Sequence, residues 1–418
     1  GSDVTLTIDL DIQLSLENEL MNAYKKYDAE GAIGIVMNPK SGEILAISSI
    51  PSFDPANYKN YSSEIINRNL AIWSNFEPGS TFKIVTLASA INEGKVDIFK
   101  EHFYDSGSIK VANSTLHCWK RKGHGDETFI QVVENSCNPG FVNLGQRLGK
   151  ETLFKYITEL GFGKKTGIDL NGEATGILFN LDKVGPVELA TTAFGQGISV
   201  TALQQVTAVS AIVNGGTLYT PYIVSSVGDD SKSPVIKKEN IITKETSDVV
   251  KYALESVVAN GSGRNAYIEN YRIGGKTGTA QKVGSDGRYM QGNYVLSFIG
   301  FMPADDPDYV MYIAIDHAKG VTQYGGVVSA PIARNVFKDI ISIHDIKEDT
   351  NGIPKSYRWD DVVYKMIPDV IGKTKKEAKK MLQGFNIEFT GDGDNVIDTS
   401  PDVNSRVKEG STIKVLLN

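Results

Sequence analysis

The sequence predicts an α+β fold, in which helices pack on a largely antiparallel sheet, followed by a small α+β module. Strand-like segments stand at both ends of the long amino-terminal part, apolar helical segments lie between them, and a polar stretch separates the last part. Because strands of one antiparallel sheet can come from both ends of a domain, with the intervening helices on its faces, this order is typical of α+β architecture. At 418 residues the chain is also too long for a single domain with one hydrophobic core, so two or more domains are expected.

The first elements follow from the spacing of apolar residues. Residues 4–8 alternate as a strand does, and Ile12, Leu16 and Leu20 then repeat every four positions, as on one face of a helix. Asp9 or Asp11 stands where a cap is expected. Apolar runs around turn-rich segments predict two hairpins. The hairpin strands are expected over residues 32–37, 43–48, 294–302 and 309–316, and a helix over 329–341.

A buried helix is predicted between Pro78-Gly79 and Gly94. Its residues are almost all apolar, so it has no wide polar face to turn toward solvent. Gly94 is a plausible end for it, since glycine favours the left-handed conformation that closes helices.

The chain is expected to divide into two domains. The first is assigned to residues 3–344, a polar linker to 345–364, and the small module to 365–418. Within the module a helix is expected over residues 375–384 and strands over 386–390 and 410–417.

Composition excludes some classes of function. The net charge of -7 gives no electrostatic reason to bind nucleic acid, so none is expected as a partner. With 41% hydrophobic and 22% charged residues the chain is typical of a soluble globular protein. No run approaches the roughly 20 apolar residues that a membrane span requires.

The chemistry of the chain is indicated first by Ser80 and Lys83. A serine and a lysine three positions apart on a helix share a face, so the amine can take the hydroxyl proton and Ser80 can act as a nucleophile. Free lysine has a pKa of about 10.4, so Lys83 can serve as a base near neutral pH only if burial or a second cation lowers that pKa. An isolated S-x-x-K motif is common by chance, and its meaning depends on partners.

Two further motifs supply such partners. Ser136-Cys137-Asn138 offers a hydroxyl for proton relay and an amide to hold a substrate carbonyl. Lys276-Thr277-Gly278-Thr279 offers a cation and two hydroxyls for a carboxylate, and Gly278 allows a close approach of the strand backbone. The order S-x-x-K, S-x-N, K-T-G is the signature of penicillin-binding proteins and serine β-lactamases.

Over roughly residues 3–341 the chain resembles the class B penicillin-binding proteins, which crosslink bacterial peptidoglycan. The tail resembles a PASTA module through Ile367-Pro368-Asp369-Val370-Ile371-Gly372 and Val407-Lys408-Glu409-Gly410-Ser411. Further matches in the first domain are Glu77-Pro78-Gly79, Gly161-Phe162-Gly163, Gly172-Glu173, Gly195-Gln196-Gly197 and Gly274-Gly275.

The resemblance implies a role for each motif residue. Ser80 resembles the acylated nucleophile, Lys83 its general base and Ser136 the relay toward the leaving amine. Asn138 resembles the clamp of the substrate amide, and Lys276, Thr277, Gly278 and Thr279 the anchor of the terminal carboxylate. The backbone N–H groups of Ser80 and Thr279 would form the oxyanion hole, whose donors contribute about 3 kcal/mol each.

A metal site is a second hypothesis. Cys118, His124 and Cys137 are ligand types suited to zinc, with Asp105, His117 or Asp126 as the fourth ligand; Asp105 is the preferred one. A disulfide between Cys118 and Cys137, or two free thiols, are the alternatives. Zinc here would be structural and would staple the loop of Ser136 and Asn138; acyl transfer itself needs no cofactor.

Partners and location follow from the resemblance alone. It implies D-Ala-D-Ala stem peptides as substrates, β-lactams as inhibitors, a partner glycosyltransferase and a single membrane anchor preceding these residues, at the extracytoplasmic face. The pattern around Cys118-Trp119 and Gly123-His124-Gly125 resembles the sporulation-specific branch, which implies spore cortex synthesis at the forespore membrane. A β-lactamase or β-lactam receptor of the same fold, and a non-enzymatic wall-binding scaffold, are the alternative functions.

Overall fold

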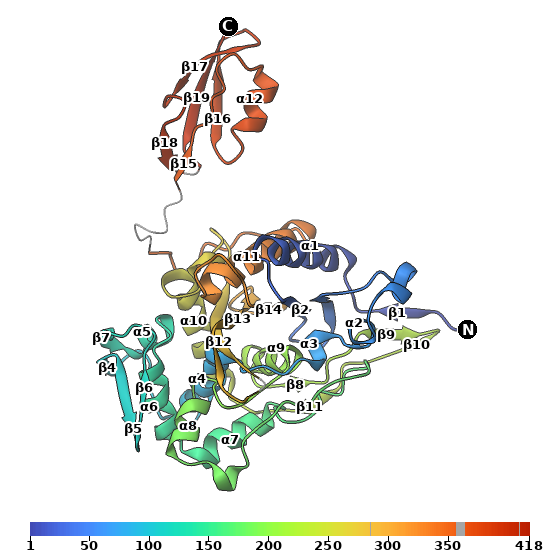
Figure 1. The fold of residues 1–418 in the computed structure, drawn as a ribbon, viewed down its shortest axis with the longest axis vertical. Coiled ribbons are helices and arrows are strands. Elements are labelled where there is room, and N and C mark those ends of the chain that lie inside the picture. The colour runs from blue at the N-terminus through green and yellow to red at the C-terminus, as the bar shows by residue number, and fades with distance from the viewer. Residues whose placement is uncertain (285, 357–363, 409) are drawn as a thin grey trace. The chain divides into compact units, whose positions relative to one another are not determined.

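The structure is a computed structural model that describes residues 1–284, 286–356, 364–408 and 410–418 (Figure 1). The chain divides into two compact units, residues 1–355 and residues 356–418. Each unit has a hydrophobic core of its own.

The first unit is built on a five-stranded antiparallel sheet whose strand order is β12-β13-β14-β2-β3. Two neighbouring strands of this sheet come from the start of the chain and three from residues beyond 270, so the expected α+β arrangement is confirmed. The strands are β2 (Gly31–Met37), β3 (Ile44–Ile50), β12 (Gly274–Val283), β13 (Tyr289–Met302) and β14 (Tyr309–Asp316).

Helices cover both faces of the sheet (Figure 1). On β2, Ile35 enters the core shared with α4 (Lys83–Asn92) and α9 (Ala202–Val213), and Val36 enters the core shared with α1 (Leu10–Lys26) and α11 (Gly325–Ile343). Alternate residues of a strand point to opposite faces, and both faces here are buried. A Cβ at Gly34 would lie 2.6 Å from Leu16 Cδ1, so this glycine lets α1 approach the sheet closely.

A helical region with two small two-stranded sheets lies beside α4 and completes the first unit. The helices are α5 (Phe129–Glu134), α6 (Asn138–Leu148), α7 (Lys150–Glu159), α8 (Pro186–Thr192) and α10 (Lys244–Asn260). The paired strands are β4 (His102–Asp105) with β7 (Gly125–Thr128), and β5 (Ser108–Val111) with β6 (Ser114–His117). Smaller elements are β1 (Val4–Leu6), α2 (Ser63–Asn67), α3 (Leu70–Trp73), β8 (Leu218–Tyr219), β9 (Val224–Val227), β10 (Asp230–Ser231), β11 (Ile236–Lys238) and the 3₁₀ turns η1 (Pro55–Asn60), η2 (Gly79–Phe82), η3 (Leu181–Lys183) and η4 (Arg264–Ala266).

The second unit is a small α+β module. Its strand β19 (Thr412–Leu417) pairs in parallel with β16 (Asn386–Thr390) and antiparallel with β17 (Val396–Ser400). Its helix α12 (Lys375–Met381) begins with a capping box at Thr374 and Glu377. A short pair, β15 (Tyr364–Met366) and β18 (Arg406–Lys408), completes it.

The start of the expected linker belongs to the first unit. Asp349 N–H donates to the Asn270 carbonyl at 2.8 Å, and Ile353 N–H donates to Glu255 Oε1 at 3.2 Å. Glu255 also accepts two hydrogen bonds from Arg272, at 3.1 and 2.8 Å, so residues 345–355 are held by a partly buried ion pair. Polarity suggested a linker here, but these polar groups find partners on the domain. Residues 357–363 of the expected linker lie outside the described residues.

Other differences from the expected elements are at their ends. The first strand ends at Leu6 rather than residue 8, α11 begins at Gly325 rather than residue 329, and α12 ends at Met381. Among the helices in the described ranges, none is long and apolar enough to cross a membrane.

Candidate active site and metal centre

The turn that carries Ser80 is a 3₁₀ turn, and the α-helix begins only at Lys83. The two side chains still share a face, because residues three positions apart eclipse one another in a 3₁₀ turn. Gly79 has φ of +54°, and a Cβ there would lie 3.2 Å from Ala280 Cβ and 3.3 Å from the Thr279 carbonyl oxygen. The turn therefore needs glycine both for its conformation and for its contact with β12.

Lys83 connects the first motif to the second. Its side chain is fully buried, and Nζ donates to the Ser136 carbonyl (2.8 Å), Ser136 Oγ (3.1 Å) and Asn138 Oδ1 (2.6 Å). Among the described residues no hydrogen bond joins Lys83 Nζ to the Ser80 hydroxyl. Catalytic hydrogen bonds are often loose without substrate, so the geometry keeps Lys83 as a candidate base.

The environment of Lys83 shifts its ionisation toward the neutral amine. Burial lowers the pKa of Lys83 to about 7, although the nearby thiols of Cys137 and Cys118 oppose the shift when ionised. At neutral pH about half of the Lys83 amines are then able to accept a proton, compared with about 1 in 2,500 for a lysine in water. The buried helix thus lowers the pKa of Lys83 far enough for its amine to act as a base near neutral pH.

The second motif lies in the turn between α5 and α6. Ser136 has φ of +53° and is 7% exposed, so its hydroxyl is held inside the site. Cys137 is the residue before α6, and Asn138 is the first residue of that helix. Asn138 Nδ2 donates to the His117 carbonyl at 3.1 Å, which ties the motif to the end of β6.

The third motif lies on β12, at the edge of the sheet. Lys276 is fully buried, and burial together with the charge of Lys83 holds its pKa well below the usual range. Thr277 Oγ1 donates to Ser262 Oγ at 3.1 Å, and Thr279 Oγ1 accepts from the Gly325 N–H at 3.3 Å. The two hydroxyls are therefore fixed on β12 by neighbours that the sequence analysis did not name.

The contact at Gly278 joins the third motif to the first. A Cβ at this position would lie 2.3 Å from Ser297 Oγ, 3.0 Å from Thr81 Cγ2 and 3.2 Å from the Pro78 carbonyl. Only glycine allows β12 to approach the nucleophile turn this closely. The structure therefore brings all three motifs to one site, with Lys83 between Ser136 and Asn138 and with β12 against the turn of Ser80.

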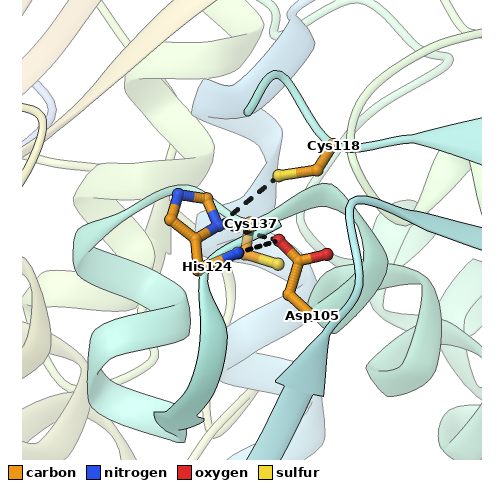
Figure 2. Close-up of side chains that lie close together, drawn as sticks. All are labelled: Asp105, Cys118, His124 and Cys137. Carbon is orange, nitrogen blue, oxygen red and sulfur yellow. Dashed lines mark hydrogen bonds and ion pairs between the residues drawn. The ribbon is translucent and has the colours of Figure 1, made fainter. Parts of the chain in front are cut away.

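Beside this site, four potential metal ligands converge (Figure 2). The ligand atoms of Asp105, Cys118, His124 and Cys137 all lie within 4.8 Å of one another. His124 Nδ1 lies 2.8 Å from Asp105 Oδ2 and 3.6 Å from Cys118 Sγ. Both thiols are free and buried. A Cys₂HisAsp set at these separations fits the tetrahedral coordination of zinc.

The other two candidates for a fourth ligand lie elsewhere. Asp126 is exposed and contacts His102 Nδ1 at 2.9 Å, and His117 is exposed at the end of β6. Asp105 is 1% exposed, and one of its oxygens accepts from the Gly107 N–H at 2.8 Å. The hydrogen bonds from the Gly107 and His124 N–H groups thus orient Asp105 toward the cluster, as hydrogen bonds to metal ligands usually do.

The electrostatics of the thiols also fit a cation. A hydrogen bond from Cys137 lowers the pKa of Cys118 to about 7. The same hydrogen bond raises the pKa of Cys137, and burial and repulsion by the Cys118 thiolate add to that rise. A bound divalent cation removes that repulsion and deprotonates coordinating thiols. The donor set is therefore one that a metal completes.

Two neighbours of this cluster were not predicted. Glu127 is 3% exposed, and its Oε2 is a buried atom that has no hydrogen-bond partner among the described residues. It lies 3.8 Å from His124 Nδ1. Trp119 Nε1 donates to the Asn135 carbonyl at 2.8 Å, next to Ser136. The spacing of Glu127 from His124 was visible in the sequence, but its burial was not.

Comparison with known proteins gives two domain matches. The family described as penicillin binding protein transpeptidase domain matches residues 32–338, and the PASTA domain family matches residues 365–418. These matches agree with the resemblances stated from the motifs.

Individual relatives point the same way. The chain is 54% identical to stage V sporulation protein D of Bacillus subtilis over 100% of this chain and 65% of that protein. It is 32% identical to penicillin-binding protein PbpB of Mycobacterium tuberculosis, over 80% of this chain and 51% of that protein. The chain thus spans 65% or less of the length of these relatives.

Among solved structures, penicillin binding protein 3 of Mycobacterium tuberculosis complexed with aztreonam is similar with a TM-score of 0.77 and 29% identity. The match covers 85% of this chain and 82% of that chain. A transpeptidase domain of penicillin-binding protein 3 from Burkholderia pseudomallei is similar with a TM-score of 0.72 and 26% identity, over 82% of this chain and 97% of that chain.

Proposed function

The chain belongs to the penicillin-binding protein transpeptidase family, and on that premise we propose that it is a peptidoglycan D,D-transpeptidase that forms an acyl-enzyme at Ser80. The observation that carries the proposal is the buried Lys83, whose pKa is lowered to about 7 and whose amine lies against the second motif. Stem peptides ending in D-Ala-D-Ala are the proposed substrates, and β-lactams the proposed inhibitors.

In the first half of the reaction, Lys83 Nζ takes the proton of Ser80 Oγ as that oxygen attacks the carbonyl carbon of the penultimate D-alanine. The backbone N–H groups of Ser80 and Thr279 stabilise the oxyanion. The C–N bond then breaks, and the leaving D-alanine amine receives the proton through Ser136 Oγ, which lies 3.1 Å from Lys83 Nζ.

Substrate orientation is assigned to the remaining motif residues. Lys276, Thr277 and Thr279 hold the terminal carboxylate, and Asn138 holds the amide of the peptide. In the second half an amine of a neighbouring stem attacks the ester carbonyl carbon of the acyl-enzyme, and its proton passes through Ser136 to Lys83. The ester C–O bond then breaks, and Lys83 returns a proton to Ser80 Oγ. Atoms and protons balance without a cofactor.

Intact-mass spectrometry after incubation with a fluorescent penicillin tests the proposal. One adduct is expected on the wild-type protein and none on Ser80→Ala, with Ser41→Ala, in the turn between β2 and β3, as the matched control that keeps the adduct. Absence of any adduct on the folded wild type would overturn the proposal. Rapid loss of the adduct would instead favour the β-lactamase alternative.

A structural zinc ion is the second proposal, held by Asp105, Cys118, His124 and Cys137. It is supported by the convergence of the four ligand atoms and by the position of Cys137 directly between Ser136 and Asn138. When bound, the ion would fix the loop that carries these two residues. Ser136 would relay the proton and Asn138 would hold the substrate amide, and the four metal ligands would keep both residues in position.

Elemental analysis tests the metal independently of activity. Wild-type protein is expected to hold one zinc per chain, and Cys118→Ser, Cys137→Ser and Asp105→Asn less. Asp126→Asn is the control, because Asp126 is exposed and bonds His102 instead. Unchanged zinc content in Cys118→Ser and Cys137→Ser would contradict the assignment, and a mass 2 Da lower than that of the thiol form would indicate a disulfide instead.

The setting is proposed from the relatives. Similarity to stage V sporulation protein D supports a role in spore cortex synthesis at the extracytoplasmic face of the forespore membrane. A membrane anchor outside these residues, a partner glycosyltransferase and wall binding by the PASTA module belong to the same proposal. Sedimentation with peptidoglycan, with and without residues 356–418, tests the contribution of the module.

A further inference from the structure

Glu77 is a buried carboxylate three positions before Ser80, and the proposed acyl transfer does not use it. It is 9% exposed. Its Oε1 accepts a hydrogen bond from the Gly197 N–H at 2.8 Å, and the hydroxyl of Tyr289 lies 3.1 Å from each of its two oxygens. Burying a carboxylate is costly unless it is hydrogen-bonded, and both donors to Glu77 come from segments far from it in the sequence.

The segments that meet at Glu77 all border the nucleophile turn. Gly197 belongs to the loop Gly195-Gln196-Gly197, and the Gly79 N–H donates to the Gly195 carbonyl at 3.0 Å. A Cβ at Gly195 would lie 2.1 Å from the Gly79 carbonyl oxygen, so this loop lies directly against the turn of Ser80. Tyr289 is the first residue of β13, in the outer part of the hairpin that β12 begins.

The ladder of that hairpin is interrupted below Tyr289. Gln281 pairs with Tyr294, but the next pair along the ladder is Val283 with Tyr289, so β13 carries several extra residues between the two pairs. Such a bulge disrupts the ladder locally and leaves the extra residues unpaired. The outer end is closed by the pair Val283 with Tyr289 and by the Gly284 N–H, which donates to the Arg288 carbonyl at 2.8 Å, but the bulge separates it from the rest of the ladder. The hydrogen bond from Tyr289 to Glu77 connects this outer end to the domain.

We propose that Tyr289 is a positioning residue for acylation, which through Glu77 holds the β12–β13 hairpin against the turn that carries Ser80. The inference rests on the proposed function. On β12, Thr277 and Thr279 precede the part that pairs with Tyr289, and Ala280 lies against Gly79. A second point of attachment beyond Ala280 keeps β12 from pivoting about that contact, which fixes the separation of the Ser80 and Thr279 backbones.

The charge on Glu77 gives the proposal a second observable. Burial raises the pKa of Glu77, and the hydrogen bonds from Gly197 and Tyr289 oppose that rise. The other charged groups lining the same cleft are Lys282, Glu30 and Asp316, and Lys282 Nζ pairs with both carboxylates at 2.8 and 2.9 Å. One lysine between two carboxylates leaves no free positive charge for Glu77, so the hydrogen bonds from the Gly197 N–H and from Tyr289 are what oppose the effect of burial on its pKa.

The test compares Tyr289→Phe, Glu77→Gln and the double variant with wild type in the second-order rate of acylation by a fluorescent penicillin. Tyr289→Phe is expected to slow acylation roughly tenfold near pH 8, about the effect of one hydrogen bond to a charged group. The ratio of its rate to the wild-type rate should fall further toward acidic pH, because Glu77 without the hydroxyl protonates at a higher pH. The pH dependence that Lys83 causes is the same in both proteins and therefore cancels in this ratio.

The controls separate positioning from folding and from the proposed function. Tyr294→Phe removes a hydroxyl from the same hairpin and should acylate as wild type, and the thermal midpoint of Tyr289→Phe should stay near that of wild type because Tyr289 is 45% exposed. The double variant should be no slower than Glu77→Gln alone. Wild-type rates in Tyr289→Phe, additive losses, or a ratio independent of pH would overturn the positioning role, whereas an unlabelled wild type would instead refute the proposed function.

Discussion

Lowering the pH from about 8.5 to about 5.5 is expected to slow acylation of Ser80 about 30-fold, because Lys83 must be neutral to take the hydroxyl proton. Burial lowers the pKa of Lys83 from 10.5 to about 7. A shift of that size corresponds to about 5 kcal/mol of preference for the neutral amine. Above the midpoint nearly every amine is free, and below it the free fraction falls tenfold with each pH unit.

The assay is stopped-flow acylation with a fluorescent penicillin at a series of pH values, with thermal denaturation at each pH to show that the protein remains folded. Ser136→Ala should be slower at every pH but keep the same midpoint, because burial rather than the Ser136 hydroxyl is the main cause of the shift. Lys83→Arg should lose both the acylation activity and its dependence on pH, since arginine stays protonated. A flat profile over this range, or a midpoint near the pKa of free lysine, would refute the assignment of Lys83 as the base.

Three further outcomes are expected. Gly278→Ala should slow acylation at least tenfold, because the new Cβ would lie 2.3 Å from Ser297 Oγ. Adding Ser297→Ala to this variant should recover part of the lost rate. No recovery would show that the contacts with Thr81 and Pro78 cause the loss instead. Removal of residues 356–418 should leave the acylation rate and the thermal midpoint of the first unit unchanged, because the two units have separate cores, and a lower midpoint would contradict their independence. Incubation with a zinc chelator should lower the thermal midpoint of wild type but not that of Cys137→Ser, and equal midpoints with and without chelator in wild type would argue against a stabilising metal.

Much of the fold was visible in local patterns. Apolar runs beside turn-rich segments predicted the strands over residues 32–37 and 309–316, and the apolar run after Gly79 predicted a buried helix, because the pattern of apolar residues reports which faces a segment buries. Element ends were less predictable. The α-helix begins at Lys83 rather than at Ser80, and residues 345–355 join the first unit because Asp349 and Ile353 find partners at Asn270 and Glu255, far away in the sequence.

For the site, the order of the three motifs indicated the residues of acyl transfer, and ligand type indicated Cys118, His124 and Cys137 as three of the proposed metal ligands. The sequence left the fourth ligand open among Asp105, His117 and Asp126, and the structure places Asp105 with the cluster. It did not reveal the buried Glu127, the Ser262 partner of Thr277 or the bond between Tyr289 and Glu77. Which side chains meet across such separations, and how deeply Lys83 is desolvated, depends on the packing of whole elements, and therefore only the tertiary structure decides it.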